Sequence, residues 1–291
     1  MIREPLKLVI PKGSLEQATL DLFKRAGWNI SVSPRNYFPT VDDDEIILAR
    51  LRAQEISRYV EAGTFDAGLT GKDWILENES DVKVIDDLVY SKVSQSPARW
   101  VLAVDAESPY RAPEDLQGKR IATELVRFTR RFFAERSISV DVEFSWGSTE
   151  AKVKEGVVDA IVDVTETGST LRANGLRIIH NLLTTNTQLI ANRKSYEDPF
   201  KRDKLDQIHL LLQAALEACK MVGLKMNVPG DKLDAVVSLL PSLNAPTVAG
   251  LYKTDWFSVE SVVSEEVVRS LIPRLLKAGA TGIIEYALNK V

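Results

Sequence analysis

The chain has 291 residues, of which 27% are charged, and its 37 lysines and arginines are outnumbered by 41 aspartates and glutamates. The net charge of −4 gives no excess positive charge for a phosphate backbone, so nucleic-acid binding is not expected. One cysteine makes no intrachain disulfide, the charged N-terminal segment does not fit a secretory signal, and no apolar run reaches the roughly 18 residues of a membrane span. We therefore expect a soluble cytoplasmic protein.

In the first two thirds of the chain, short apolar runs alternate with segments of helical periodicity. The run Leu6–Ile10 predicts a buried strand, and Leu15, Ala18, Leu22 and Ala26 then recur at helical spacing. Further strands are predicted at residues 45–50, 67–70, 82–89, 100–104, 120–123, 140–144, 160–164 and 188–192, and helices at 54–62, 128–136 and 149–155. This alternation predicts a mostly parallel sheet covered by helices, with ligands at the carboxyl ends of its strands.

The pattern changes after residue 192. A polar loop leads into a long helix with Leu205, Ile208, Leu212, Ala215 and Cys219 on one face. The last segment predicts strands at 224–228, 256–263 and 282–286 and helices at 231–240 and 265–277, with a further strand near 248–252 left open. That order is typical of a small α+β regulatory module, in which a proline at position 273 should kink or split the second helix.

One segment, residues 159–171, has the pattern of a phosphate site. A strand with Asp159 and Asp163 leads into the turn Thr167–Thr170, where glycine, hydroxyls and consecutive amides suit a phosphate. We expect the two aspartates to lie at the same strand end and to accept hydrogen bonds from a ribose. An ordinary strand–turn–helix fits the spacing equally well, and Glu166 would repel a phosphate unless its side chain turns away.

Two other turns follow predicted strands and have the same logic. They contribute Lys12, Gly13, Gly71, Lys72 and Asp73. A plain strand–helix loop explains either turn by itself, but three such loops at one sheet edge predict a ligand with several phosphates, with Arg50 and Arg52 adding positive charge. The two histidines, His180 and His209, do not have metal-ligand or triad spacing, so no nucleophile–base set is expected.

Together these loops resemble the long form of the ATP phosphoribosyltransferases, the enzymes that open histidine biosynthesis. The resemblance covers the whole chain, in residues 11–15, 51–63, 66–73, 118–123, 159–171, 240–247 and 277–283. It implies an α/β fold: a two-lobed, periplasmic-binding-protein-like catalytic core and a C-terminal ferredoxin-like (α+β) regulatory domain. Lobe I would comprise 1–93 and 181–216, lobe II 94–180, and the regulatory domain 217–291.

The resemblance also implies a reaction. The 5-phosphoribosyl group of phosphoribosyl pyrophosphate would pass to N1 of the adenine of ATP, releasing pyrophosphate, with Mg²⁺ held mainly by substrate phosphates. Long-form members look like homo-oligomers, dimers building hexamers, that are inhibited by histidine bound to the third domain. No residue is expected to act as acid or base, because such a transfer needs positioning and charge neutralisation above all.

The resemblance further implies residue roles. The 5-phosphate cradle would be Glu166, Thr167, Gly168, Ser169 and Thr170, with Asp159 and Asp163 on the ribose hydroxyls. Pyrophosphate or triphosphate would face Lys12, Gly13, Gly71, Lys72 and Asp73, with Arg50 near ATP and Thr247 at the effector site.

Some residues depart from the family pattern, and other functions remain open. Thr123–Val126 replaces a common Tyr-Pro, and Glu55 and Ser57 stand where Asp and Pro are usual. The alternative function is a non-catalytic two-lobed receptor for a phosphorylated small ligand. A receptor for an amino acid would need fewer cations in its cleft. A transcription-factor effector domain would need a DNA-reading helix pair and a basic face, neither of which the sequence predicts.

Overall fold

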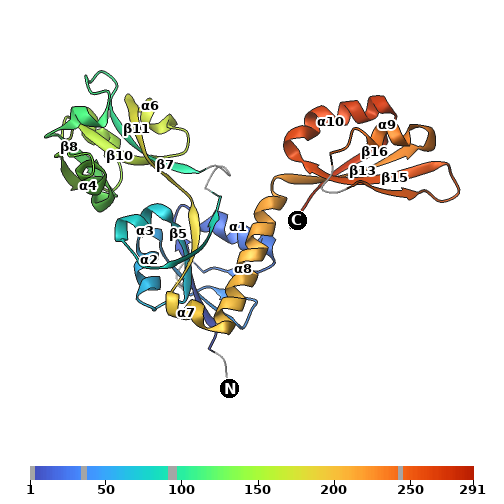
Figure 1. The fold of residues 1–291 in the computed structure, drawn as a ribbon, viewed down its shortest axis with the longest axis horizontal. Coiled ribbons are helices and arrows are strands. Elements are labelled where there is room, and N and C mark those ends of the chain that lie inside the picture. The colour runs from blue at the N-terminus through green and yellow to red at the C-terminus, as the bar shows by residue number, and fades with distance from the viewer. Residues whose placement is uncertain (1–3, 34–37, 91–96, 242–244) are drawn as a thin grey trace. The chain divides into compact units, whose positions relative to one another are not determined.

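The computed structural model describes residues 4–33, 38–90, 97–241 and 245–291 (Figure 1). The chain divides into two compact units. The first contains Met1–Asp21 and Trp28–His209, and the second contains Leu22–Gly27 and Leu210–Val291. The first unit holds two five-stranded sheets, and we call each sheet with its helices a lobe.

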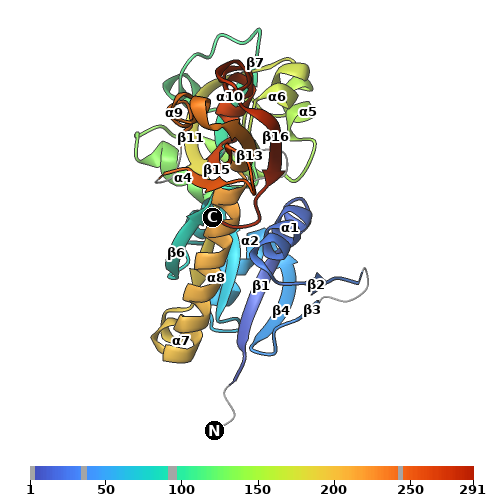
Figure 2. The ribbon, with the colours of Figure 1, turned by 90° about the vertical axis from the view of Figure 1, so that its right-hand side faces the viewer.

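Lobe I contains the strand order β4-β1-β5-β12-β6. Its strands are β1 (Leu6–Lys12), β4 (Ile46–Arg52), β5 (Ala67–Gly71), β6 (Lys83–Leu88) and β12 (Thr187–Ala191). β1 pairs in parallel with β4 and β5, whereas β12 is antiparallel to β5 and β6. The helices that follow the parallel strands are α1 (Glu16–Ala26), α2 (Ala53–Glu61) and α3 (Lys72–Asn78), and Figure 2 shows α1 and α2 beside β1 and β4. The strands β1, β4 and β5 therefore all lead into helices at one edge of the sheet.

Lobe II contains the order β11-β7-β10-β8-β9. Its strands are β7 (Ala98–Asp105), β8 (Arg120–Thr123), β9 (Asp141–Phe144), β10 (Ala160–Thr165) and β11 (Leu176–Thr185), and its helices are α4 (Val126–Ala134), α5 (Thr149–Lys154) and α6 (Ser169–Ala173), with a 3₁₀ turn at Pro113–Leu116. Trp100, Ile121 and Phe133 belong to the core on one face of the sheet, and Val101, Ile161 and Leu171 to the core on the other. The sheet is thus covered on both faces, as expected.

Both sheets are mixed, so the expectation of a mostly parallel sheet is wrong in part. β7 is antiparallel to both β10 and β11, and β12 is antiparallel to its two neighbours. The chain returns from lobe II to lobe I directly from β11 into β12, and β11 itself was not predicted. Two register shifts in β11 break the alternation of inward and outward side chains, which removes the period-two signal of a strand.

A long helix returns along lobe I. Helix α8 (Pro199–Ala218) follows the short α7 (Arg193–Glu197). Its predicted apolar face is confirmed, since Leu205, Ile208 and Leu212 are fully buried.

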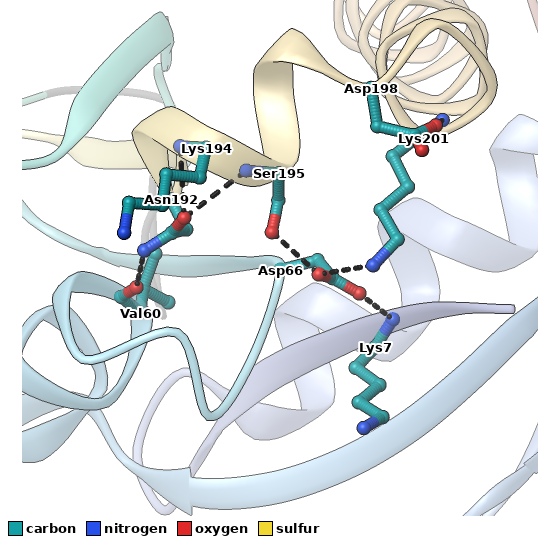
Figure 3. Close-up of polar contacts among 8 residues, drawn as sticks. All are labelled: Lys7, Val60, Asp66, Asn192, Lys194, Ser195, Asp198 and Lys201. Carbon is teal, nitrogen blue, oxygen red and sulfur yellow. Dashed lines mark hydrogen bonds and ion pairs between the residues drawn. The ribbon is translucent and has the colours of Figure 1, made fainter. Parts of the chain in front are cut away.

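Asp66 ties this returning segment to the sheet (Figure 3). Its carboxylate accepts hydrogen bonds from the amide of Lys7 at 2.9 Å and from Ser195 Oγ at 2.6 Å. Lys201 Nζ donates to the same carboxylate at 2.8 Å. Burial acts to raise the pKa of Asp66, but the bonds from Lys201, Ser195 and the Lys7 amide outweigh it, so the pKa lies below its ordinary value. Asp66 is therefore a charged, fully bonded anchor.

The acidic run at residues 42–45 makes a second tie of this kind. Lys204 Nζ lies 3.1 Å from Asp43 Oδ2 and 2.5 Å from Glu45 Oε2, and Trp28 Nε1 donates to Asp43 at 3.0 Å. These carboxylates therefore bind the ammonium of Lys204, a cation that the chain itself supplies.

The second unit contains a four-stranded antiparallel sheet in the order β14-β15-β13-β16. Its elements are β13 (Met221–Pro229), a 3₁₀ turn (Gly230–Lys232), α9 (Leu233–Val237), β14 (Thr247–Gly250), β15 (Trp256–Ser264), α10 (Glu265–Ala278) and β16 (Thr281–Ala287). β14 is the strand that the sequence left open, and Thr247 begins it with an exposed side chain.

The expected split of the second helix at Pro273 is wrong. α10 runs unbroken through this residue, which lies on the exposed side of the helix. Val268, Leu271 and Leu275 are buried in the core on either side of it. Their packing onto the sheet holds the helix together despite the amide that proline lacks.

Candidate functional site

A cavity of about 410 Å³ lies in the first unit and is lined by both lobes. Lobe I contributes the ends of β1, β4 and β5 and the segments that follow them, and lobe II contributes the end of β10 and the start of β7. The described lining residues are Pro11, Lys12, Gly13, Ser14, Leu15, Arg52, Ala53, Gln54, Gly71, Asp73, Trp74, Tyr90, Ala98, Trp100, Glu124, Val164, Thr165, Glu166, Thr185, Asn186 and Thr187. We expected the three predicted loops to share one sheet edge, but they do not. They come from two sheets that face a common cavity.

The first loop of lobe I, which contains Lys12 and Gly13, is linked through Glu16 to the buried Arg50. Lys12 and Gly13 line the cavity. The Gly13 amide donates to Glu16 at 3.3 Å, and Glu16 forms an ion pair with Arg50, whose side chain is only 4% exposed. Arg50, predicted to lie near ATP, is not among the lining residues. Arg52, two residues or about 7 Å farther along β4, lines the cavity instead.

The second loop of lobe I places a buried carboxylate at the cavity. A Cβ at Gly71 would lie 2.0 Å from Asp73 Oδ1, so only glycine permits this conformation of the aspartate. Asp73 Oδ2 accepts from Trp100 Nε1 at 2.6 Å, and Oδ1 accepts from the Trp74 amide at 3.0 Å. Burial raises the pKa of Asp73 in spite of these bonds. Lys72 is exposed and lies outside the lining set.

In lobe II, the predicted phosphate loop lines the cavity only at its start. Thr165 and Glu166 line the cavity, but residues 167–170 do not. Gly168, in the left-handed conformation with φ +73°, donates its amide to Thr165 Oγ1 at 2.8 Å. The Ser169 amide donates to Thr167 Oγ1 at 3.3 Å. Two of the amides expected to bind a phosphate therefore bind threonine hydroxyls, which a phosphate oxygen would have to replace.

The two aspartates of β10 do not share a strand end, which corrects the sequence-based expectation. Asp159 precedes the strand, accepts from the Arg120 amide at 3.0 Å and lies 3.9 Å from Lys119. Asp163 is four residues later, about 13 Å farther along an extended strand. Burial and, to a smaller extent, the carboxylates Glu150 and Glu124 raise its pKa to about 6, although the Val164 amide donates to it. Neither aspartate is among the lining residues, but Asp163 directly precedes Val164, which lines the cavity.

Several lining residues were missed by sequence reasoning. Glu124 is half-buried, and burial raises its pKa although Gln54 donates a hydrogen bond to it. Tyr90 is buried with its hydroxyl 2.8 Å from Thr19 Oγ1, and burial raises its pKa to about 12. The connection Thr185–Thr187 reaches the cavity only because the chain returns to lobe I there, which no local pattern signals.

The charge lining the cavity is mixed. Among the described lining residues, two side chains are basic, Lys12 and Arg52, and three are acidic, Asp73, Glu124 and Glu166. Among the residues that the structure describes, no group of three or more His, Cys, Asp or Glu side chains is arranged to hold a metal ion. Within the same ranges, we find no helix with the length and apolarity that a membrane span requires.

Comparison with known proteins assigns this architecture to a family. Residues 52–214 match the family model described as "ATP phosphoribosyltransferase", and residues 218–290 match the model of the C-terminal domain of the same family. The chain belongs to the ATP phosphoribosyltransferase family. It is similar to the ATP phosphoribosyltransferases of Solidesulfovibrio magneticus, at 66% identity over 98% of each chain, and of Desulfatibacillum aliphaticivorans, at 65% over 99% of each.

As a member of the ATP phosphoribosyltransferase family, the protein is a pentosyltransferase. It transfers the 5-phosphoribosyl group of phosphoribosyl pyrophosphate to N1 of the adenine of ATP, the first step of histidine biosynthesis. The predicted fold is also confirmed. The ATP phosphoribosyl transferase (HisG:HisZ) complex from Thermotoga maritima includes a chain with TM-score 0.62 and 30% identity, covering 73% of this chain and 98% of that one. XAC2383 from Xanthomonas citri bound to ATP shares the fold alone, at TM-score 0.51 and 16% identity over 73% of this chain and 84% of that one.

Proposed function

We propose that the transfer takes place in the cavity between the lobes, with phosphoribosyl pyrophosphate spanning it. The single observation that carries this proposal is that loops with anion-binding character from both lobes line one cavity. On the lobe II side, the 5-phosphate is held by the loop from Glu166 through Thr167, Gly168 and Ser169 to Thr170. Asp163 accepts hydrogen bonds from the ribose hydroxyls. Asp159 has no part in the site, because it lies at the other end of the strand.

On the lobe I side, the pyrophosphate and the triphosphate of ATP face Lys12, Gly13, Gly71 and Asp73. Arg52 supplies the second positive charge, since it reaches the cavity where Arg50 does not. Arg50 acts indirectly: its ion pair with Glu16 fixes the first loop. Lys72 has at most a peripheral role from its exposed position.

The chemistry suits a site without an acid–base pair. The adenine N1 is unprotonated, pyrophosphate is a good leaving group, and charge develops mainly on the sugar carbon and the departing oxygens, so rate comes from alignment and charge stabilisation. Mg²⁺, bound mainly through substrate phosphates, would neutralise charge on the leaving pyrophosphate. Among the described residues no group of three or more His, Cys, Asp or Glu side chains is arranged to hold a metal, so the ion would depend on the substrate phosphates, with Glu166 of the cavity lining available as one further ligand.

The second unit supports a regulatory proposal. Its residues 218–290 match the family's C-terminal domain, and we propose that histidine binds this unit, with Thr247 at the effector site, and inhibits the transfer. The protein would work in the cytoplasm as a homo-oligomer of dimers that build a hexamer.

A turnover assay tests the reaction and the regulation together. Protein incubated with ATP, phosphoribosyl pyrophosphate and Mg²⁺ should produce a rise in near-ultraviolet absorbance from N1-substituted adenine, and added histidine should slow it. A flat trace with folded protein that binds phosphoribosyl pyrophosphate would favour the receptor alternative instead.

A pair of glycine variants tests the position of the 5-phosphate. A Cβ at Gly168 would lie 3.1 Å from Ile178 Cδ1 and from Arg172 Nη1, whereas Gly156 has nearly the same φ of +67° with nothing within 4 Å of its Cβ. Both alanine variants carry a left-handed strain of about 1–2 kcal/mol, but only Gly168→Ala should displace the loop. We expect calorimetry to show phosphoribosyl pyrophosphate bound about tenfold more weakly by Gly168→Ala than by Gly156→Ala, a difference of about 1.4 kcal/mol. Equal affinities would remove this loop from the site.

A further inference from the structure

Helix α3 is part of lobe I by connection, but its side chains contact lobe II. Trp74 packs against the core of lobe II, and its ring meets that of Trp100 edge to face with centroids 6.2 Å apart. Asp73, one residue earlier, accepts the hydrogen bond of Trp100 Nε1. The first turn of α3, which lines the cavity, is therefore fixed to both lobes.

The second turn of α3 makes a more specific contact with lobe II. Helix α4 begins at Val126, and its N-cap residue, Leu125, offers no side-chain acceptor. The amides of its second and third residues, which no helix can satisfy internally, donate to Glu77. Arg127 N lies 3.0 Å from Glu77 Oε1, and Phe128 N lies 2.9 Å from Oε2. A carboxylate of one lobe thus caps a helix of the other, at the helix end where negative charge is favoured.

A side chain of α4 in turn contacts the C-terminal end of α3. Arg131, on α4, donates to the carbonyl of Leu76 at 3.0 Å and forms an ion pair with Glu79, the residue that ends α3. The cation thereby lies at the negative end of α3, as helix electrostatics favours. Each helix supplies the charge that the end of the other one needs.

We propose that Glu77 is a positioning residue for the transfer, which sets the separation of the two walls of the cavity. The proposal rests on the placement of the substrates proposed above. α3 carries Asp73 and Trp74 on the cavity wall at one end and the cap of α4 at the other, so the cap fixes the first wall against lobe II. Without the cap, the lobes sample other alignments, and apparent substrate affinity falls by the fraction of protein that is aligned. A substrate that touches both walls restores the alignment once bound, so the rate at saturation is retained.

The chain offers a matched control. Glu61 Oε1 also accepts a backbone amide, that of Asp81 at 2.9 Å, but donor and acceptor both belong to lobe I. In Glu77→Ala we expect KM for phosphoribosyl pyrophosphate to rise about tenfold, or about 1.4 kcal/mol, with kcat changed less than about twofold. In Glu61→Ala both constants should stay within about twofold of the parent. Glu77→Gln keeps one acceptor oxygen and should raise KM about threefold, which preserves the test if Glu77→Ala does not fold.

Tryptophan fluorescence supplies a readout that a purely structural role would not move. Trp74 and Trp100 lie at the contact between the lobes, so the free Glu77→Ala variant should show red-shifted emission that saturating phosphoribosyl pyrophosphate reverses. The proposal would be overturned if Glu77→Ala left KM for phosphoribosyl pyrophosphate unchanged or lowered kcat without raising KM. An equal rise of KM in Glu61→Ala would overturn it as well. Failure of the substrate placement would appear separately, as equal affinities of the Gly168 and Gly156 variants.

Discussion

Two carboxylates that anchor lobe I differ from two carboxylates of lobe II near the cavity in the direction of their pKa shifts. In lobe I, Asp66 and Asp43 each contact a lysine ammonium, and their hydrogen bonds bring both pKa values below the ordinary range although burial opposes it. In lobe II, Glu124 and Asp163 are half-buried, and burial raises both of their pKa values. The carboxylates Glu150 and Glu124 add to the upward shift of Asp163.

This difference separates structural acids from acids held for function. A carboxylate whose oxygens are all engaged by hydrogen bonds and ion pairs within the protein stabilises the fold and cannot also bind a ligand. One whose desolvation outweighs its hydrogen bonds and charge interactions destabilises the free protein, and such groups are concentrated at functional sites. On this reasoning Asp66 and Asp43 hold lobe I together, whereas Asp73 of lobe I and Glu124 and Asp163 of lobe II are desolvated acids held for the substrate.

The largest effect should come from Asp66. Asp66→Asn leaves the ammonium of Lys201 buried without its counter-charge and should lower the free energy of unfolding by about 3 kcal/mol at pH 7. Because the pKa of Asp66 is lowered in the folded protein, its contribution is present above the unfolded value of about 3.9 and is lost as the pH falls below that value. Urea unfolding at pH 7 and pH 3 should therefore show the gap between parent and variant closing in acid.

An exposed ion pair gives the control for this prediction. The side chains of Asp81 and Arg193 are 70% and 58% exposed and lie 2.7 Å apart. Asp81→Asn should change the unfolding free energy by less than about 1 kcal/mol. If both variants lost the same stability, the distinction between the anchored carboxylate and a surface one would fail.

The next effect concerns the wall of lobe I. Glu16→Gln weakens the tie between Arg50 and the first loop and should lower the unfolding free energy by about 2 kcal/mol. Because the loop lines the cavity, KM for ATP should rise as well. Steady-state kinetics that show lost stability with an unaltered KM would mean that Arg50 does not position this loop.

The smallest effect has the opposite sign. The pKa of Asp163 is raised to about 6, so the folded protein holds this proton more tightly, and its stability falls as the pH rises from about 4 through 6. Asp163→Asn removes this penalty and should stabilise the protein by on the order of 1 kcal/mol at pH 7, with no gain at pH 4, after allowance for solvent screening. Its affinity for phosphoribosyl pyrophosphate should fall, since the ribose loses a charged acceptor. A variant that is less stable at pH 7 would contradict the account.

Much of the fold could be predicted because its signals are local. The predicted strands were found within one to three residues at each end, and the buried face of α8 follows directly from the spacing of Leu205, Ile208 and Leu212. β11 was missed because its register shifts disturb the alternation of its side chains. The continuity of α10 through Pro273 depends on tertiary packing, which local propensity does not contain.

The site was predicted less completely, for reasons of distance along the chain. The sequence indicates which turns favour anions, and Lys12, Gly13, Gly71, Asp73 and Glu166 all line the cavity. It does not show how far a strand projects, which decides between Arg50 and Arg52. Contacts between lobes, such as Glu77 with the amides of α4, join residues some 50 positions apart and have no local signature.

A crystal structure of the protein soaked with phosphoribosyl pyrophosphate tests the central claim most directly. The account predicts the 5-phosphate on the amides of Gly168 and Ser169, with the hydroxyls of Thr165 and Thr167 turned aside, and the pyrophosphate facing Lys12 and Arg52. Sugar bound outside this cavity, or inside it with both threonine hydroxyls still on those amides, would contradict it.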